Sequence, residues 1–138
     1  MTLDDIEHRI LRPEFKDARI HFAINCASMS CPVLADRPYV AGTLGADLDQ
    51  AAGRYLASAE GARLDGAVVR VSSIFDWYGD DFIPEYASIV SGQRAAKARA
   101  ILGALARFAP APVAAVAKAG TARVRFLPYD WSLNDIAR

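Results

Sequence analysis

Arg63-Leu-Asp-Gly-Ala-Val-Val-Arg-Val71 is the stretch of sequence that decides the fold class. Its Asp65-Gly66 dipeptide is typical of a tight turn, and the residues on either side favour strands, so the stretch predicts a β-hairpin. Residues 19 to 27 and residues 121 to 127 also have strand character. We therefore expect a small antiparallel sheet of three or four strands.

Helical patterns surround these strands. Thr2 is a suitable cap for a helix over residues 3 to 11, which should end before Pro13. Further helices are expected over residues 43 to 56, 73 to 77, 85 to 91, 93 to 108 and 113 to 118. This mixture predicts an α+β fold in which several helices pack on the sheet. With 138 residues, the chain can build one hydrophobic core, and we expect a single domain over residues 1–138.

The composition is that of an ordinary soluble globular protein, with 53% apolar and 23% charged residues and sixteen charges of each sign. No apolar run approaches the ~18 residues that a membrane span needs. The seven charged residues between Glu85 and Asp130 are all basic, but their spacing indicates a solvated face and no nucleic-acid site. We expect no metal and no cofactor, because Cys-x-x-Cys pairs and clustered histidines are absent. As written, the chain should be cytoplasmic, whereas a fragment of a longer protein could be periplasmic or exported.

Both cysteines lie in the stretch His21-Phe-Ala-Ile-Asn-Cys-Ala-Ser-Met-Ser-Cys-Pro-Val-Leu34. If residues 19 to 27 form a strand, Cys26 faces the core, because side chains alternate along a strand. His21 and Asn25 then lie on the opposite surface. This stretch is therefore the first candidate for a functional site.

A catalytic interpretation centres on Cys31. Pro32 can occupy the first position of a helical turn through Ala35, which would place the Cys31 thiol at the positive end of that turn and lower its pKa. His21 as the base and Asp130 as its orienter would complete a thiol triad, provided that the strands near residues 21 and 127 are neighbours.

The same stretch allows a non-catalytic interpretation. Cys26 and Cys31 can close a small loop by a disulfide. Asn25, Ser28 and Ser30 can satisfy backbone groups where the strand turns. In the catalytic interpretation, by contrast, Asn25 or the backbone amides near Ser30 would stabilise an oxyanion.

A ligand-binding site is a further role that some of these residues suggest. The candidate binding residues are Ser28, Ser30, Trp77, Tyr78 and Trp131. The alternative for the aromatic members is a place in the core, with their polar tips hydrogen-bonded.

Three more blocks accompany the cysteine stretch. They are Thr2-Leu-Asp-Asp-Ile-Glu-His8, Ile74-Phe-Asp-Trp-Tyr-Gly-Asp-Asp-Phe82 and Phe126-Leu-Pro-Tyr-Asp-Trp-Ser-Leu-Asn134. Together the blocks resemble the domain-of-unknown-function family numbered 547 (DUF547), and the H-x-A-x-N-C-x-S-x-S-C-P layout carries most of the match. The resemblance implies a family and no activity, since the family is known as an uncharacterised one from bacteria, plants and animals. Its bacterial members often carry export signals.

The chain departs from the family pattern at its N-terminal side. Family members usually have a helical stretch with an aromatic-x-Asn-x-Tyr-Asn-Ala motif before the Thr2 block, and this chain lacks it. The chain therefore resembles the C-terminal portion of the family domain. The missing helix would leave an apolar surface through which the chain could form a homo-oligomer. Other partners are unknown.

The order of His21 and Asp130 is loosely similar to that of transglutaminase-type and papain-type thiol enzymes. In those enzymes the cysteine comes earlier in the chain, but no cysteine precedes His21 here. The irregular order slightly favours a non-catalytic binding or assembly module with a rigid His/Asn/Cys site. The alternative is a thiol-dependent hydrolase or acyl-transfer domain that uses Cys31, His21 and Asp130.

Overall fold

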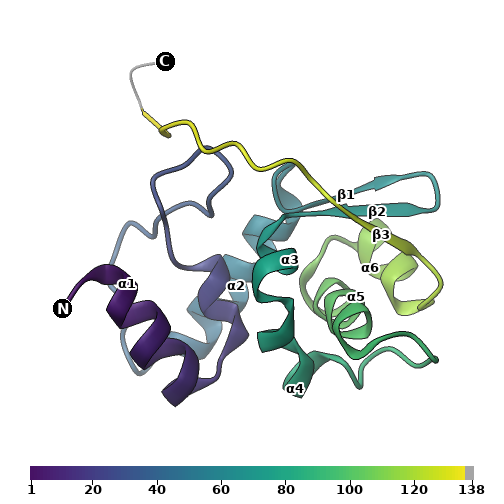
Figure 1. Ribbon diagram of the computed structural model, residues 1–138, viewed down its shortest axis with the longest axis horizontal. Coiled ribbons are helices and arrows are strands. Elements are labelled where there is room, and N and C mark those ends of the chain that lie inside the picture. The colour runs from purple at the N-terminus through teal and green to yellow at the C-terminus, as the bar shows by residue number, and fades with distance from the viewer. Residues whose placement is uncertain (136–138) are drawn as a thin grey trace.

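The structure, a computed structural model, describes residues 1–135 and confirms the predicted α+β class (Figure 1). In chain order the elements are α1 (Leu3–Asp5), the π-helix η1 (Ile6–Phe15), the 3₁₀-helix η2 (Ala18–Phe22), α2 (Leu44–Ala57), β1 (Ala62–Asp65), β2 (Val68–Val71), α3 (Ile74–Tyr78), the 3₁₀-helix η3 (Gly79–Phe82), α4 (Ile83–Tyr86), α5 (Ala96–Phe108), α6 (Ala111–Lys118) and β3 (Arg123–Phe126). No helix within the described residues is both long and apolar enough to cross a lipid bilayer.

The three strands pair in the order β1-β2-β3. Strands β1 and β2 form the predicted hairpin, and Gly66 in its turn has a φ of +59°, which glycine adopts easily because it has no Cβ. Strand β3 pairs with β2 in parallel, so the sheet is mixed, and the expectation of antiparallel pairing throughout is wrong for β3. The chain passes through α3 to α6 between β2 and β3, and such a crossover returns the chain in the same direction.

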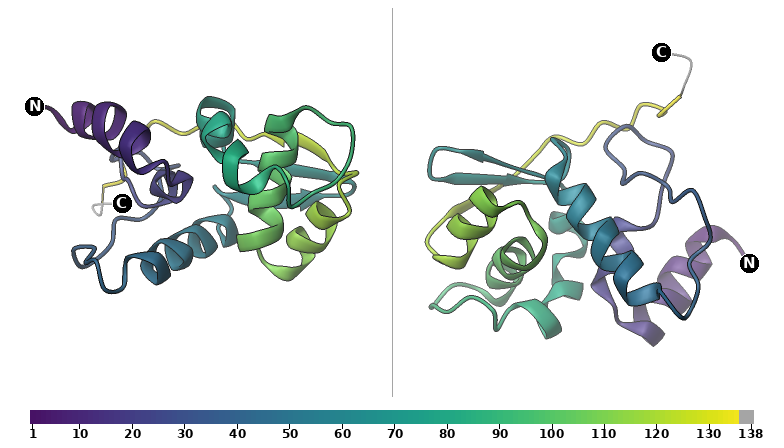
Figure 2. Two further views of the ribbon diagram at one scale, coloured as in Figure 1. Left: turned by 90° about the horizontal axis from the view of Figure 1, so that it is seen from below. Right: turned by 180° about the vertical axis from the view of Figure 1, so that it is seen from behind.

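The core lies between one face of the sheet and helices α5 and α6, and it extends to buried residues of η2, α2, α3, η3 and α4 (Figures 1 and 2). Helix α5 is buried along most of its length and contacts α2, α4 and α6. Val69 and Val71 of β2 are fully buried in this core. Gly103 lets α5 approach the backbone of Tyr86, because a Cβ at this position would overlap the Tyr86 carbonyl oxygen.

The N-terminal helix is longer than predicted. Thr2 caps it as expected, and its hydroxyl oxygen accepts a hydrogen bond from the backbone N–H of Asp5 at 3.1 Å. The expected end before Pro13 is wrong, because the helix continues as η1 to Phe15 and stops at Lys16, whose φ is +54°. In an α-helix the proline ring would meet the carbonyl group four residues earlier, and the wider π-turn moves that group aside.

Residues 19 to 27 do not form the predicted strand. The 3₁₀-helix η2 covers the first part of this segment, and a long connection follows before α2. Asp17 caps η2, since its carboxylate accepts from the backbone N–H of Arg19 at 3.0 Å. This local capping outweighs the alternating apolar pattern. His21 is consequently buried, with 4% exposure, and the prediction that it lies on the surface is wrong.

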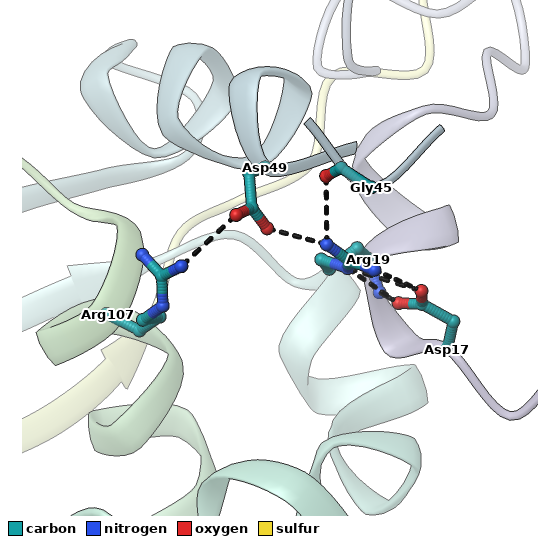
Figure 3. Close-up of polar contacts among 5 residues, drawn as sticks. All are labelled: Asp17, Arg19, Gly45, Asp49 and Arg107. Carbon is teal, nitrogen blue, oxygen red and sulfur yellow. Dashed lines mark hydrogen bonds and ion pairs between the residues drawn. The ribbon is translucent and has the colours of Figure 1, made fainter. Parts of the chain in front are cut away.

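A polar network around Arg19 and Asp49 ties the N-terminal segment to two helices (Figure 3). The Arg19 guanidinium lies 2.6 Å from Asp17 Oδ2 and 2.6 Å from Asp49 Oδ1, and it donates to the carbonyl oxygen of Gly45 at 3.0 Å. The other carboxylate oxygen of Asp49 pairs with Arg107 of α5 at 3.1 Å. The network therefore joins η2, α2 and α5.

Candidate functional site

Cys26 and Cys31 form a disulfide that closes the loop of residues 26 to 31, as predicted for the non-catalytic alternative. Cys26 is exposed, so its expected place in the core is wrong. Residues 32 to 35 are not helical, and the turn that would have activated a Cys31 thiol is therefore not formed. The Tyr129 hydroxyl donates to this disulfide and lies 3.2 Å from Cys31 Sγ. In this state neither cysteine is a thiolate nucleophile.

Asn25 clamps the two ends of the disulfide loop. Its Nδ2 donates to the carbonyl oxygen of Pro32 at 2.7 Å, and its Oδ1 accepts from the backbone N–H of Ala27 at 2.7 Å. Ala27 has a φ of +60°, a left-handed conformation that a residue with a Cβ adopts only when its surroundings hold it. The Asn25 amide is thus used in holding the loop, and its role toward an oxyanion stays a prediction.

Ser28 and Ser30 attach the loop to the C-terminal segment. Both serines are 2% exposed. Ser28 donates its hydroxyl to the Tyr129 oxygen at 3.1 Å. Ser30 donates to Glu60 Oε2 at 2.6 Å and accepts from the backbone N–H of Asp130 at 2.9 Å. Ser30 thus bonds to a backbone group, Ser28 bonds to a side chain, and both serines brace the loop.

His21 is buried against Asp81 and Tyr78. Its Nε2 lies 2.8 Å from Asp81 Oδ2, and its ring stacks on Tyr78 with the ring centroids 4.3 Å apart. Arg12 donates to both oxygens of the same carboxylate, at 2.7 and 3.1 Å. Asp81 is therefore shared between an imidazole and a bidentate guanidinium.

The environment defines the protonation state of this pair. Burial lowers the pKa of His21 below its ordinary value, although the hydrogen bond to Asp81 opposes that shift. Burial alone would raise the pKa of Asp81, but the hydrogen bonds from Arg12 and His21 lower it overall. At neutral pH a neutral imidazole therefore donates its Nε2–H to an ionised carboxylate.

His21 and both cysteines line one cleft of about 240 Å³, which we call the aromatic cleft. It lies where the N-terminal helix, the disulfide loop, α3 and the C-terminal segment meet. Its aromatic and acidic lining residues are Asp4, Glu7, Trp77, Tyr78, Tyr129 and Trp131. Three of the predicted binding residues, Trp77, Tyr78 and Trp131, are thus brought together, whereas Ser28 and Ser30 are not among the lining residues.

Three aromatic rings form the outer wall of the aromatic cleft. The ring centroids of Tyr129 and Trp131 are 4.5 Å apart, and Trp77 lies 4.9 Å from Tyr129 and 5.4 Å from Trp131. Trp77 is 44% and Trp131 is 65% exposed. Large aromatic side chains usually bury most of their surface, so two exposed tryptophans beside a cleft mark a candidate ligand site.

The aromatic cleft is acidic. Asp4 and Glu7 contribute carboxylates, and no lysine or arginine of the described part of the chain lines the cleft. The pKa of Tyr78 is raised by burial and, in second place, by the negative charge of Glu7. His8 Nδ1 accepts a hydrogen bond from Arg12 at 3.0 Å. The other ring nitrogen, Nε2, can therefore donate, and it lies 3.4 Å from Asp4 Oδ1.

Asp130 does not accompany His21 in this arrangement. Its Oδ1 accepts from the backbone N–H and the hydroxyl of Ser132, at 2.9 and 2.6 Å. The carboxylate that orients His21 in the structure is that of Asp81, a residue that sequence reasoning missed as a partner. Within residues 1–135, no group of three or more histidines, cysteines or carboxylates could hold a metal ion.

The N-terminal part of the chain, from α1 almost to the end of α2, carries a recognisable family signature. Residues 1–56 match the family model described as Protein of unknown function, DUF547. This part of the chain is therefore similar to DUF547. The expected resemblance is thus confirmed for 56 of the 138 residues. No curated protein and no solved structure matches the chain.

The segment that matches the family model supplies only one side of the aromatic cleft. It contains His21, the disulfide loop and the acidic side chains of the N-terminal helix. Asp81 and the three rings of the outer wall lie beyond the matched residues. The description of the family states no activity.

Proposed function

We propose that this chain is a non-catalytic binding module whose aromatic cleft takes a cationic group, such as an alkylammonium. The lining of the cleft supports this proposal, because it contains aromatic rings and two carboxylates. Among the described residues, no lysine or arginine lines the cleft. A cation over an aromatic face gains roughly 0.5 to 2 kcal/mol, and a nearby carboxylate adds Coulomb attraction.

The molecule already holds one cation on a ring of this cleft. The guanidinium carbon of Arg12 lies 4.9 Å from the centroid of the Tyr78 ring. Tyr78 also stacks on His21, so its faces are used within the protein. Trp77 and Trp131 are the more exposed rings, and they support binding of an external cation.

The direct test is a titration followed by tryptophan fluorescence. Tetramethylammonium should change the fluorescence in a saturable way, because the only tryptophans of the chain are Trp77 and Trp131. Neopentyl alcohol, a neutral compound of similar size, should bind much more weakly. Equal responses to both compounds would show that the cleft recognises apolar bulk and would contradict the cation proposal.

Two glutamates on the same helix provide matched variants. Glu7→Gln removes a carboxylate from the cleft and should weaken tetramethylammonium binding by about fivefold, which corresponds to ~1 kcal/mol. Glu14→Gln makes the same chemical change at an exposed position that does not line the cleft, and its affinity should stay near that of the unmodified protein. Equal losses in the two variants would point to net charge alone.

A thiol-dependent hydrolase or acyl-transfer domain is the second candidate, because Cys31 and His21 line the same cleft. Cys26→Ser would free the Cys31 thiol without added reductant. If the chain is an enzyme, this variant should hydrolyse an activated ester, and replacing His21 should abolish that activity. Under the binding proposal, the freed thiol should react with iodoacetamide at the pH expected of an ordinary cysteine, and no turnover should appear.

The disulfide also bears on the compartment. Disulfides persist mainly in oxidising surroundings, so the Cys26–Cys31 bridge supports an exported or periplasmic location over a cytoplasmic one. Mass spectrometry of the alkylated protein from a reducing and from an oxidising compartment tests this inference. If the disulfide forms equally in the reducing compartment, it does not support an exported or periplasmic location.

A further inference from the structure

The outward face of the sheet carries a row of arginines. Arg63, Arg70 and Arg125 are direct register partners across β1, β2 and β3. Side chains alternate between the two faces of a strand, so all three point to the same side. The neighbours Val69 and Val124 point to the opposite side, where they pack on the core. Three guanidinium groups thus follow one another across adjacent strands.

Little on this face neutralises the row. Arg123 shares the face. Among the described strand residues that point to this side, Asp65 alone has a carboxylate, and it pairs with Arg70 Nε at 2.9 Å. Within the described residues, no ion pair joins Arg63 or Arg123 to an acidic side chain. Like charges that are directly opposite each other destabilise a sheet. The row of arginines therefore does not stabilise the folded sheet. A bound external anion would offset the repulsion between the guanidinium groups.

We propose that this arginine face, formed by Arg63, Arg70, Arg123 and Arg125, docks the protein on an anionic phospholipid surface. Guanidinium groups donate two parallel hydrogen bonds to a phosphate, which suits them to lipid headgroups. The row crosses all three strands and Arg123 extends it along β3, so the cations form a continuous patch that several headgroups can contact together.

The geometry favours a lipid surface over a nucleic acid. Duplex grooves accept a helix or a two-stranded ribbon, whereas this row spans three strands. Single strands are usually held by stacking on aromatic side chains, and no strand residue on the outward face is aromatic. The arginine face is separate from the aromatic cleft, and neither proposal depends on the other.

The test is co-sedimentation of the full chain with lipid vesicles at low ionic strength. The protein should bind vesicles that contain phosphatidylglycerol, should not bind vesicles of phosphatidylcholine alone, and should be released by added salt. Arg63→Gln/Arg125→Gln should weaken binding by about 25-fold, since each arginine near an anionic surface contributes about fivefold.

A matched double variant controls for net charge. Arg54→Gln/Lys118→Gln removes two charges at exposed positions of α2 and α6, outside the arginine face, and should lower binding by less than about threefold. Equal losses in the two double variants, or no binding of the unmodified protein to phosphatidylglycerol, would overturn the proposal. So would arginine-dependent binding of a labelled oligonucleotide without vesicle binding, because the occupant would then be a nucleic acid.

Discussion

At the scale of single residues, His21 shows how burial and one partner define a titration. The imidazole has 4% exposure, stacks on Tyr78 and donates to Asp81. Burial lowers the pKa of His21, so the folded protein takes up this proton at a lower pH than the unfolded chain does. Protonation therefore favours the unfolded state.

This linkage predicts a loss of stability in mild acid. As the pH falls below about 6.5, the ordinary pKa of histidine, the unfolded chain binds a proton that folded His21 does not, and the free energy of unfolding should decrease. His21→Phe keeps a ring against Tyr78 but removes the titration. Urea unfolding between pH 7.5 and 5.5 should show a smaller decrease for this variant. Parallel curves for the two proteins would mean that other groups cause the acid sensitivity.

The residues of the site differ in how far sequence could reveal them. The disulfide was predictable because Cys26 and Cys31 are close in the chain and the sequence contains no other cysteine. The contact between His21 and Asp81 was not predictable, because it joins residues 60 positions apart through the packing of η2 on α3 and η3. By residue type alone, Asp130 was as good a candidate as Asp81 for the carboxylate that orients His21. Only the tertiary fold distinguishes the two.

At the scale of elements, helix α5 is packed as closely as its backbone allows. Gly103 faces the carbonyl group of Tyr86, and there is no room for a Cβ between them. In α2, Gly53 lies in ordinary contact, since a Cβ there would be 3.7 Å from the carbonyl oxygen of Phe108. Both glycines lie inside helices, so the two positions differ mainly in the space around them.

The same substitution should consequently have opposite effects at these two glycines. Gly103→Ala should lower the free energy of unfolding by about 1 to 3 kcal/mol, because α5 must move away from Tyr86. Gly53→Ala should raise it by up to about 1 kcal/mol, because alanine is the better helix former. Chemical denaturation of both variants checks this contrast. A stabilised Gly103→Ala variant would show that α5 can shift at little cost.

Repulsion within the arginine face should also affect the stability of the sheet. Arg63→Gln/Arg125→Gln removes both outer charges that repel Arg70 across the strands. The free energy of unfolding should therefore rise by about 0.2 to 1 kcal/mol at low salt and should change little at high salt. Thermal unfolding at two salt concentrations measures the effect. A double variant that unfolds earlier at low salt would mean that the arginines stabilise the sheet.

Elements with a strong local pattern were predictable, and those decided by distant contacts were not. The long apolar stripes of α2 and α5 and the Asp65-Gly66 turn of the hairpin are local signals, and the structure confirms them. The alternation over residues 19 to 27 was misleading, because Asp17 caps a 3₁₀-turn and Arg19 anchors that turn to α2. The parallel pairing of β3 depends on a long crossover, which periodicity does not report.

At the scale of the whole molecule, the disulfide loop joins parts of the chain that are distant in sequence. Cys31 and Pro32 line the aromatic cleft and also a second cavity of about 160 Å³ beside α2. Through Ser28 and Ser30 the same loop holds the C-terminal segment, which carries Trp131. The arrangement of the cleft therefore depends on the loop as well as on the residues that face the ligand.

Removing the disulfide should weaken both the fold and the cleft. For so short a loop, the gain in entropy of the unfolded chain predicts that Cys26→Ser/Cys31→Ser lowers the free energy of unfolding by about 2 kcal/mol. Reduced unmodified protein should match this variant, which separates loss of the bridge from the serine substitutions. Tetramethylammonium affinity should fall in both, because opening the loop loosens the contacts that the Tyr129 hydroxyl makes at positions 26 and 31, and the outer wall is less well held. Unchanged affinity together with reduced stability would mean that the Asn25 clamp and the serine contacts alone keep the cleft in place.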